Sequence, residues 1–216
     1  MTTEQVGKWE GEFGSEYTKR NTHNNREGVD NYYLKNFGLS RTDMNQEFLG
    51  SLDKNIRILE VGTNIGLQLH ILAKMGFKNL YGVEVNSDAI ESGRKLNEGL
   101  PIHIIKGDAM NIPFKDNFFD LVFTSGVLIH IHPDNIIKVV REMYRCSAKF
   151  IWGFEYYTDK GYVNVDYRGN KNLLWKTDFK NLFLKTFPDL SLVKEKNYPY
   201  LTKKGLTDQM YLLEKK

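Results

Sequence analysis

The chain has 216 residues, of which 41% are hydrophobic and 26% charged, the composition of an ordinary globular protein with one domain and some additions. Lysine and arginine total 30 against 27 for aspartate and glutamate, so the formal charge is only +3, and the basic residues are spread along the chain. This balance argues against a nucleic-acid-binding protein, in which basic residues cluster on one face.

The cysteine content and the apolar runs bear on the compartment. Cys146 is the single cysteine, so no disulfide can form within the chain, which fits a reducing environment. No apolar run approaches the ~20 residues that span a bilayer, and residues 1–5 are too polar for a signal peptide. We therefore expect a cytoplasmic protein without a membrane partner.

The first 53 residues are polar and aromatic and show no strand pattern, which predicts an N-terminal helical cap over 1–53 with one helix near 42–52. This region contains a dense string, W-x-G-x-F-G-x-x-Y-x-x-R-N, from Trp9 to Asn21. If the string is helical, Tyr17, Arg20 and Asn21 share one face of the helix.

From residue 54 the pattern changes to alternating strands and helices. The clearest helix is expected at 134–145, where apolar residues recur with the helical period from Ile136 to Tyr144. The alternation predicts an α/β domain over 54–216, with a doubly wound, mostly parallel sheet covered by helices on both faces. The expected strands cover residues 56–61, 80–85, 102–106, 119–124, 148–154, 190–196 and 209–214.

Acidic residues stand at the ends of the first three expected strands. Glu60 closes the first, Glu84 closes the second, and Asp108 follows the third. Because the carboxyl ends of parallel strands meet at one edge of a sheet, these three acids are expected around one ligand crevice.

The loop after the first strand reads E-x-G-x-N-x-G, from Glu60 to Gly66. A dinucleotide fingerprint would read G-x-G-x-x-G, and a carboxylate beside it would repel a pyrophosphate. A carboxylate suits an ammonium group or a ribose instead. The segment 56–155 resembles class I S-adenosylmethionine-dependent methyltransferases. Asn64 replaces the middle glycine of that family's loop, and asparagine tolerates left-handed backbone geometry.

The resemblance implies S-adenosylmethionine as the cofactor, S-adenosylhomocysteine as its product, and a seven-stranded sheet with an antiparallel last strand. It implies that Glu60 contacts the methionine end of the cofactor, Glu84 the ribose and Asp108 the adenine amino group. Without the resemblance, the alternative roles are structural: Glu60 would cap a turn, Glu84 would be a negative charge at a helix N-terminus, and Asp108 would be a turn aspartate. The cofactor residues implied are Glu60, Gly62, Asn64, Gly66, Glu84, Val85, Asp108, Ala109 and Ser125.

The loop beyond the fourth strand runs from Ser125 to His130 and would line the methyl-transfer site. His130 is the first candidate for a catalytic base, because an unperturbed histidine has a pKa near ~6.5. A purely structural histidine is the alternative. His132 is expected at the start of the following helix. The sequence has no Cys/His cluster with metal-ligand spacing, so no metal site is expected.

An insertion over 155–176 is expected to form a lid over the substrate. It begins with Glu155 and Tyr156 and continues through glycines and aromatic residues to Arg168. An ordinary surface loop is the alternative. Its last motifs and the N-terminal string resemble the pseudaminic acid biosynthesis-associated methylases. Glu155 and Tyr156, after the fifth strand, and Tyr17, Arg20 and Asn21, on one helix face, are expected substrate contacts, and the narrower resemblance adds Arg168 and Lys176.

We therefore expect methyl transfer from S-adenosylmethionine to the oxygen or nitrogen of a small polar acceptor, of the class of sugars or sugar-derived acids. Arg168 would contact a carboxylate or phosphate of an acidic acceptor. The alternatives are a peptide or protein amine methyltransferase and a cofactor-binding sensor or assembly subunit. The loop Ser125-Gly126-Val127-Leu128 lacks the motif of base-modifying enzymes, which disfavours a nucleic-acid substrate.

Overall fold

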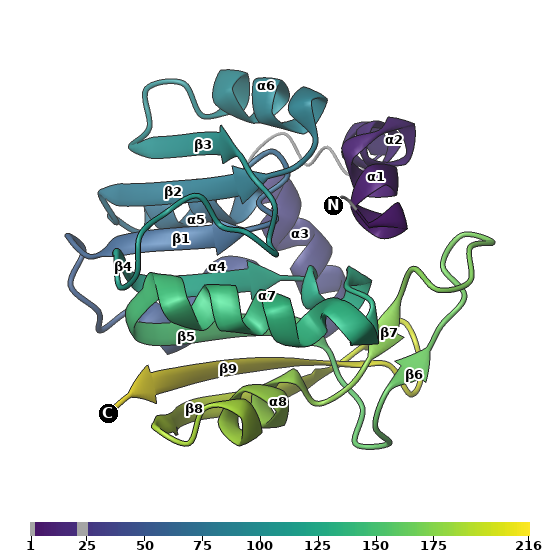
Figure 1. The fold of residues 1–216 in the computed structure, drawn as a ribbon. Coiled ribbons are helices and arrows are strands. Elements are labelled where there is room, and N and C mark those ends of the chain that lie inside the picture. Colours follow the sequence, from purple (N-terminus) through teal and green to yellow (C-terminus); the bar gives the residue numbers. More distant parts are fainter. Residues whose placement is uncertain (1–2, 21–25) are drawn as a thin grey trace.

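The computed structural model describes residues 3–20 and 26–216, and it contains a seven-stranded sheet in the order β3-β2-β1-β4-β5-β9-β8 (Figure 1). Strands β1 to β5 run parallel, and β9 runs antiparallel between β5 and β8. This confirms the predicted fold class, including the antiparallel strand. The strands of the sheet are β1 (Arg57–Val61), β2 (Asn79–Glu84), β3 (Ile102–Lys106), β4 (Phe119–Ser125), β5 (Ser147–Tyr156), β8 (Leu190–Pro199) and β9 (Thr207–Lys215).

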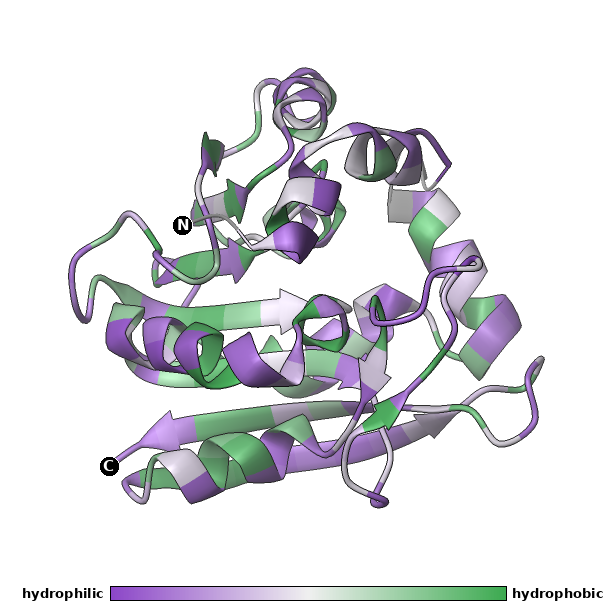
Figure 2. Ribbon diagram, turned by 45° about the vertical axis from the view of Figure 1, so that its right-hand side comes forward, coloured by the Kyte–Doolittle hydropathy of each residue, from purple (hydrophilic) through white to green (hydrophobic). Residues whose placement is uncertain are grey.

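Helices cover both faces of the sheet. Residues alternate between the two faces along each strand, so Ile58 packs with the cluster under α4 and α5 while Leu59 packs with the cluster under α7 and α8. Hydrophobic segments accordingly concentrate in the strands (Figure 2). The helices are α1 (Glu4–Glu10), α2 (Glu12–Arg20), α3 (Arg26–Phe37), α4 (Arg41–Leu49), α5 (Leu67–Lys74), α6 (Ser87–Leu96), α7 (Pro133–Cys146) and α8 (Phe179–Thr186), with a short 3₁₀ turn η1 (Leu128–His130).

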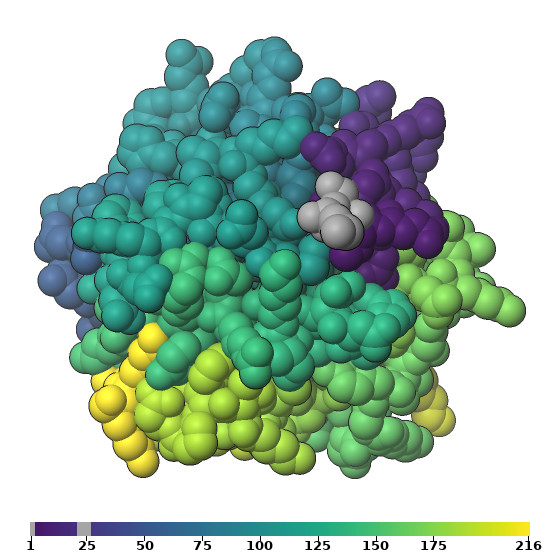
Figure 3. Space-filling view, in the orientation of Figure 1, coloured from purple at the N-terminus to yellow at the C-terminus, as the bar shows by residue number. Residues whose placement is uncertain are grey.

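The N-terminal helices and the segment 155–176 lie together at one end of the sheet. Figure 3 shows the N-terminal helices beside this later segment, and Gln5 joins them through a 3.0 Å hydrogen bond from its side-chain nitrogen to the carbonyl oxygen of Asn172. The parallel strands end at this edge, and the antiparallel β9 begins there. Residues from both ends of the chain therefore surround the same edge of the sheet.

Some elements differ from the sequence-based expectation. The helix predicted near 42–52 begins earlier, because Ser40 caps it, and it ends at Leu49 before Gly50. The expected insertion holds a short hairpin, β6 (Val163–Asn164) with β7 (Trp175–Lys176). Strands of two residues are too short to show an alternating pattern in the sequence, so the sequence does not predict the hairpin. Over residues 3–20 and 26–216, no helix combines the length and apolarity needed to cross a bilayer.

Candidate active site

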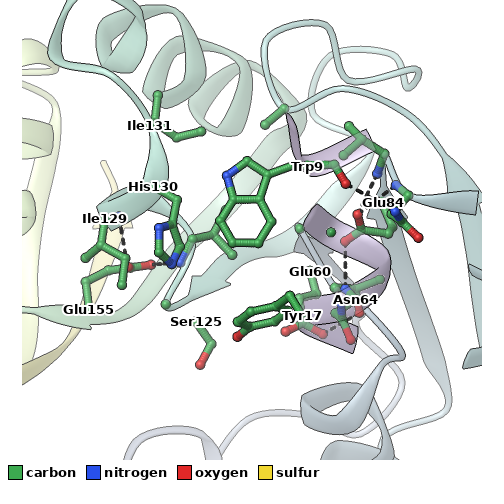
Figure 4. Close-up of a pocket in the computed structure, with 18 of the residues that line it drawn as sticks. Trp9, Tyr17, Glu60, Asn64, Glu84, Ser125, Ile129, His130, Ile131 and Glu155 are labelled. Carbon is green, nitrogen blue, oxygen red and sulfur yellow. Dashed lines mark hydrogen bonds between the residues drawn. The ribbon is translucent and has the colours of Figure 1, made fainter. Parts of the chain in front are cut away.

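A pocket of about 380 Å³ opens at the carboxyl edge of the sheet (Figure 4). Loops after β1, β2 and β3 form one part of its wall, and residues of α3, β5 and β9 form another. Helices α1 and α2 contribute Trp9 and Tyr17 to the wall. The volume falls in the usual range for sites that bind small molecules.

The loop after β1 takes the left-handed backbone conformation three times. The φ angles are 72° at Gly62, 50° at Asn64 and 77° at Gly66. A Cβ atom at Gly62 would lie 2.8 Å from the Val127 side chain, so a glycine is needed for this close approach. The Asn64 side-chain amide donates a 2.8 Å hydrogen bond to the Thr18 hydroxyl, which joins α2 to the loop.

Glu84 lies at the end of β2 with its carboxylate buried in the pocket wall. One oxygen accepts hydrogen bonds from the backbone N–H groups of Val85 (2.8 Å) and Asn86 (2.9 Å), and the other accepts from that of Asn64 (2.8 Å). Burial raises the pKa of Glu84 above its ordinary value, while these N–H groups oppose the rise. A carboxylate has about four acceptor positions, so it can still accept from ribose hydroxyls.

Glu60 is the second buried carboxylate and is 3% exposed. The Thr63 hydroxyl donates a 2.6 Å hydrogen bond to it. Burial raises the pKa of Glu60 to about 8, against the opposing effects of Thr63 and of the buried Arg41 guanidinium. A cationic ligand in the pocket would favour the ionised form.

Asp108 follows β3 on the same side of the pocket. One carboxylate oxygen accepts a 2.8 Å hydrogen bond from the backbone N–H of Met110. Asp108 lines the pocket, where its second carboxylate oxygen can accept from a donor such as an adenine amino group. Val85 and Ala109 line the neighbouring wall, and the Ser125 hydroxyl, at the end of β4, accepts a 3.2 Å hydrogen bond from Arg41.

These residues fit S-adenosylmethionine. Within the described residues, neither Glu60 nor Glu84 forms an ion pair with a lysine or arginine, so the pocket wall holds buried acceptors without a matching cation. The cofactor carries an ammonium group, a sulfonium and two ribose hydroxyls, which match such acceptors. Groups of three or more side chains suited to hold a metal ion do not occur in the described part of the chain.

His130 lies across the pocket from the loop after β1, in η1. Its Nδ1 atom is 2.7 Å from the carbonyl oxygen of Leu173. A carbonyl only accepts, so Nδ1 carries the proton and Nε2 keeps a lone pair. Burial lowers the pKa of His130 to about 4, although the Leu173 carbonyl opposes this. The pKa of His130 is therefore lower than the unperturbed value near 6.5 on which the sequence-based expectation rests, and His130 is neutral at physiological pH.

Glu155 shapes the loop that carries His130. Its carboxylate accepts hydrogen bonds from the backbone N–H groups of Val127 (3.1 Å) and Ile129 (3.4 Å). Burial raises the pKa of Glu155 to about 7, and these hydrogen bonds oppose the rise. Glu155 lines the pocket as expected, but its oxygens are directed at the backbone, which makes it a positioning residue for the loop.

Aromatic side chains from α1 and α2 face His130. The Trp9 ring lies 4.7 Å from the His130 ring and 5.3 Å from the Tyr17 ring, between centroids. Tyr167 lies 5.1 Å from His130, between ring centroids. Tyr17 and Tyr156 line the pocket, as the sequence suggests for substrate contacts.

Three of the expected substrate residues, Arg20, Arg168 and Lys176, stand outside the pocket wall. Arg20 is exposed at the end of α2 and pairs with Glu16 at 3.1 Å. Arg168 is exposed in the loop between β6 and β7, outside the pocket wall. Asn21 lies outside the described residues.

Several pocket residues have no counterpart in the sequence-based set. Asp208 is the second residue of β9 and is 2% exposed, and Tyr200 follows β8. Tyr32 and Tyr33 come from α3. The sequence-based expectation places acidic pocket residues at the ends of parallel strands, whereas an antiparallel strand brings its first residues to the same edge. The segment Thr207-Asp208-Gln209, at the start of the last strand, is the sequence feature that indicates Asp208.

Residues 59–149 match the family model described as "Methyltransferase domain". Among curated proteins, cycloartenol-C-24-methyltransferase 1 from Oryza sativa subsp. japonica is 31% identical over 107 residues, covering 45% of this chain and 30% of the relative. The chain spans about a third of the length of the curated relatives it matches.

Solved structures share the fold over most of the chain. A SAM-dependent methyltransferase from Leishmania major matches with a TM-score of 0.71 and 18% identity, covering 98% of this chain and 87% of that one. The PH0226 protein from Pyrococcus horikoshii OT3 matches with a TM-score of 0.69 and 16% identity, covering 93% and 99%. The match to a methyltransferase model covers residues 59–149, and the solved structures show that the chain shares their fold.

Proposed function

We propose that the protein transfers a methyl group from S-adenosylmethionine to a small polar acceptor, of the class of sugars or sugar-derived acids. The observation that carries this proposal is the continuity of the pocket. The loop at Gly62 and the carboxylates of Glu60 and Glu84 share one cavity with His130 and a group of tyrosines. In this proposal the cofactor lies beside Glu60 and Glu84, the acceptor lies beside His130 and the tyrosines, and both occupy the same cavity.

The protein contributes mainly by aligning the acceptor with the methyl group and by excluding water, because the bound cofactor would supply an activated methyl group. Trp9 and Tyr17 from the N-terminal helices cover the pocket, and Glu155 holds the loop of His130 in position. The lone pair on Nε2 of His130 can accept a proton from the acceptor, directly or through a water.

The enclosure of the pocket favours a small acceptor over a polymer. About 380 Å³ must hold both the methyl donor and the acceptor, and α1, α2 and α3 all contribute residues to the wall. Tyrosine rings with their hydroxyls suit a ligand that has both apolar faces and polar groups. Neither Arg168 nor Lys176, which lies 5.7 Å from the Tyr156 ring centroid, is among the residues that line the pocket.

The experiment uses methyl-labelled S-adenosylmethionine and two fractions of cell extract, one of small molecules and one of proteins. We expect label in the small-molecule fraction only, and much less with the Glu84→Gln variant. Label in the protein fraction would contradict the small acceptor and favour a peptide or protein amine. Cofactor binding without label in either fraction would favour a sensor or assembly subunit.

A further inference from the structure

Asp208 has a carboxylate oxygen without a partner in the pocket wall. The Tyr200 hydroxyl donates a 3.1 Å hydrogen bond to Oδ2, whereas Oδ1 is buried and has no hydrogen-bond partner among the described residues. Burying an acceptor unsatisfied costs about 1–3 kcal/mol, so native proteins rarely leave one. Asp208 lines the pocket, so a donor of a bound ligand, an N–H or an O–H, can satisfy Oδ1 after a small movement of the side chains that bury it.

The surroundings of Asp208 favour an N–H of a cation over a neutral O–H as the donor. Rings of Tyr32, Tyr33, Tyr156 and Tyr200 line this end of the pocket, and aromatic faces attract organic cations. Glu155 is the second carboxylate on this side. No lysine or arginine is among the described residues of the pocket wall, so the electrostatic field at this end favours a positive charge.

Two cations lie near Asp208 without lining the pocket. The buried Arg41 guanidinium donates hydrogen bonds to Asn45, Tyr33 and Ser125, which occupy three of its five N–H donors. Lys176 lies beyond the Tyr156 ring. Burial raises the pKa of Asp208 to about 7, because Arg41 and Lys176 lower it by less than burial raises it. A ligand cation in contact with Oδ1 would stabilise the ionised carboxylate further.

We propose that Asp208 and the surrounding tyrosines bind the amino group of the acceptor, so that the protein methylates the nitrogen of a small amine. This inference rests on the proposed function. The acceptor enters as an ammonium ion and gives one proton to the Asp208 carboxylate. Its nitrogen lone pair then forms the new N–C bond, while the sulfur keeps the electron pair of the broken S–C bond and becomes a thioether.

The test uses two analogues of S-adenosylhomocysteine in which nitrogen replaces the sulfur and carries a short arm. One arm ends in an amino group and the other in a hydroxyl, and two-, three- and four-carbon arms sample the reach to Asp208. Calorimetry measures each dissociation constant with wild type, Asp208→Asn and the control Asp159→Asn. Asp159 is an exposed carboxylate outside the pocket wall, so its loss should change nothing.

We expect the best amino arm to bind wild type and Asp159→Asn at least tenfold more tightly than the matched hydroxyl arm, and Asp208→Asn to lose this preference. Equal binding of the two arms to wild type at every length, or a preference for the hydroxyl arm, would overturn the inference whatever the variant does. A preference that survives in folded Asp208→Asn would overturn the role of Asp208. Failure of S-adenosylhomocysteine itself to bind would instead contradict the proposed function.

Discussion

Replacing Glu84 by glutamine tests the cofactor side of the pocket with almost no change in shape. Glutamine keeps one oxygen, which can still accept from the N–H groups of Val85 and Asn86. Its amide nitrogen then faces the N–H of Asn64, where the wild-type carboxylate accepts a 2.8 Å hydrogen bond. Two donors therefore oppose each other, and the ribose loses a charged acceptor.

The size of the effect follows from these contacts. A hydrogen bond to a charged group contributes about 1.5–3 kcal/mol, which corresponds to roughly a 10- to 150-fold weaker dissociation constant. Calorimetry with S-adenosylhomocysteine measures this constant, and the melting temperature shows whether the variant is folded. Glu91→Gln is the matched control, because Glu91 is exposed on α6 and pairs only with Lys95 in the described structure. Unchanged affinity in a folded Glu84→Gln protein would remove Glu84 from the cofactor site.

Four further predictions concern His130, the lid and the loop after β1. Because the folded-state pKa of His130 is lowered to about 4, the stability of wild type relative to His130→Asn should fall by about 1–2 kcal/mol between pH 7 and pH 5, as urea unfolding of both proteins at the two pH values measures. With an identified acceptor, His130→Ala should lower turnover ~10²-fold if His130 is the base, and equal turnover would end that role. Hydrogen exchange should show residues 12–20 and 155–168 more protected with S-adenosylhomocysteine, whereas equal protection would mean a fixed wall. Asn64→Val should weaken cofactor binding because a β-branched residue resists the φ of 50°, whereas Asn64→Gly should bind within about threefold of wild type, and equal affinities would refute the strain argument.

The sequence predicts the sheet because buried strands and amphipathic helices alternate with clear periods. It also points to Glu60, Glu84 and Asp108, since the end of a parallel strand is a local feature that a single sequence displays. Asp208 is different, because its position at the pocket depends on the reversed direction of β9.

The acceptor side depends on long-range packing that no short pattern encodes. Tyr33 reaches the pocket because α3 and α4 pack together and place it against Arg41 and Phe154. Arg168 fits an acidic substrate by its charge alone, but the β6–β7 hairpin holds it at the surface. Burial also explains the pKa of His130, since the sequence gives the residue type but not its environment.

The position of S-adenosylhomocysteine in a crystal of the complex tests the central claim most directly. The account predicts the ribose hydroxyls at Glu84, the adenine beside Asp108 and the sulfur facing the space between His130 and Asp208. A nucleoside bound on the tyrosine side, away from Glu84, would contradict it, as would tighter binding of a nicotinamide dinucleotide in the same pocket.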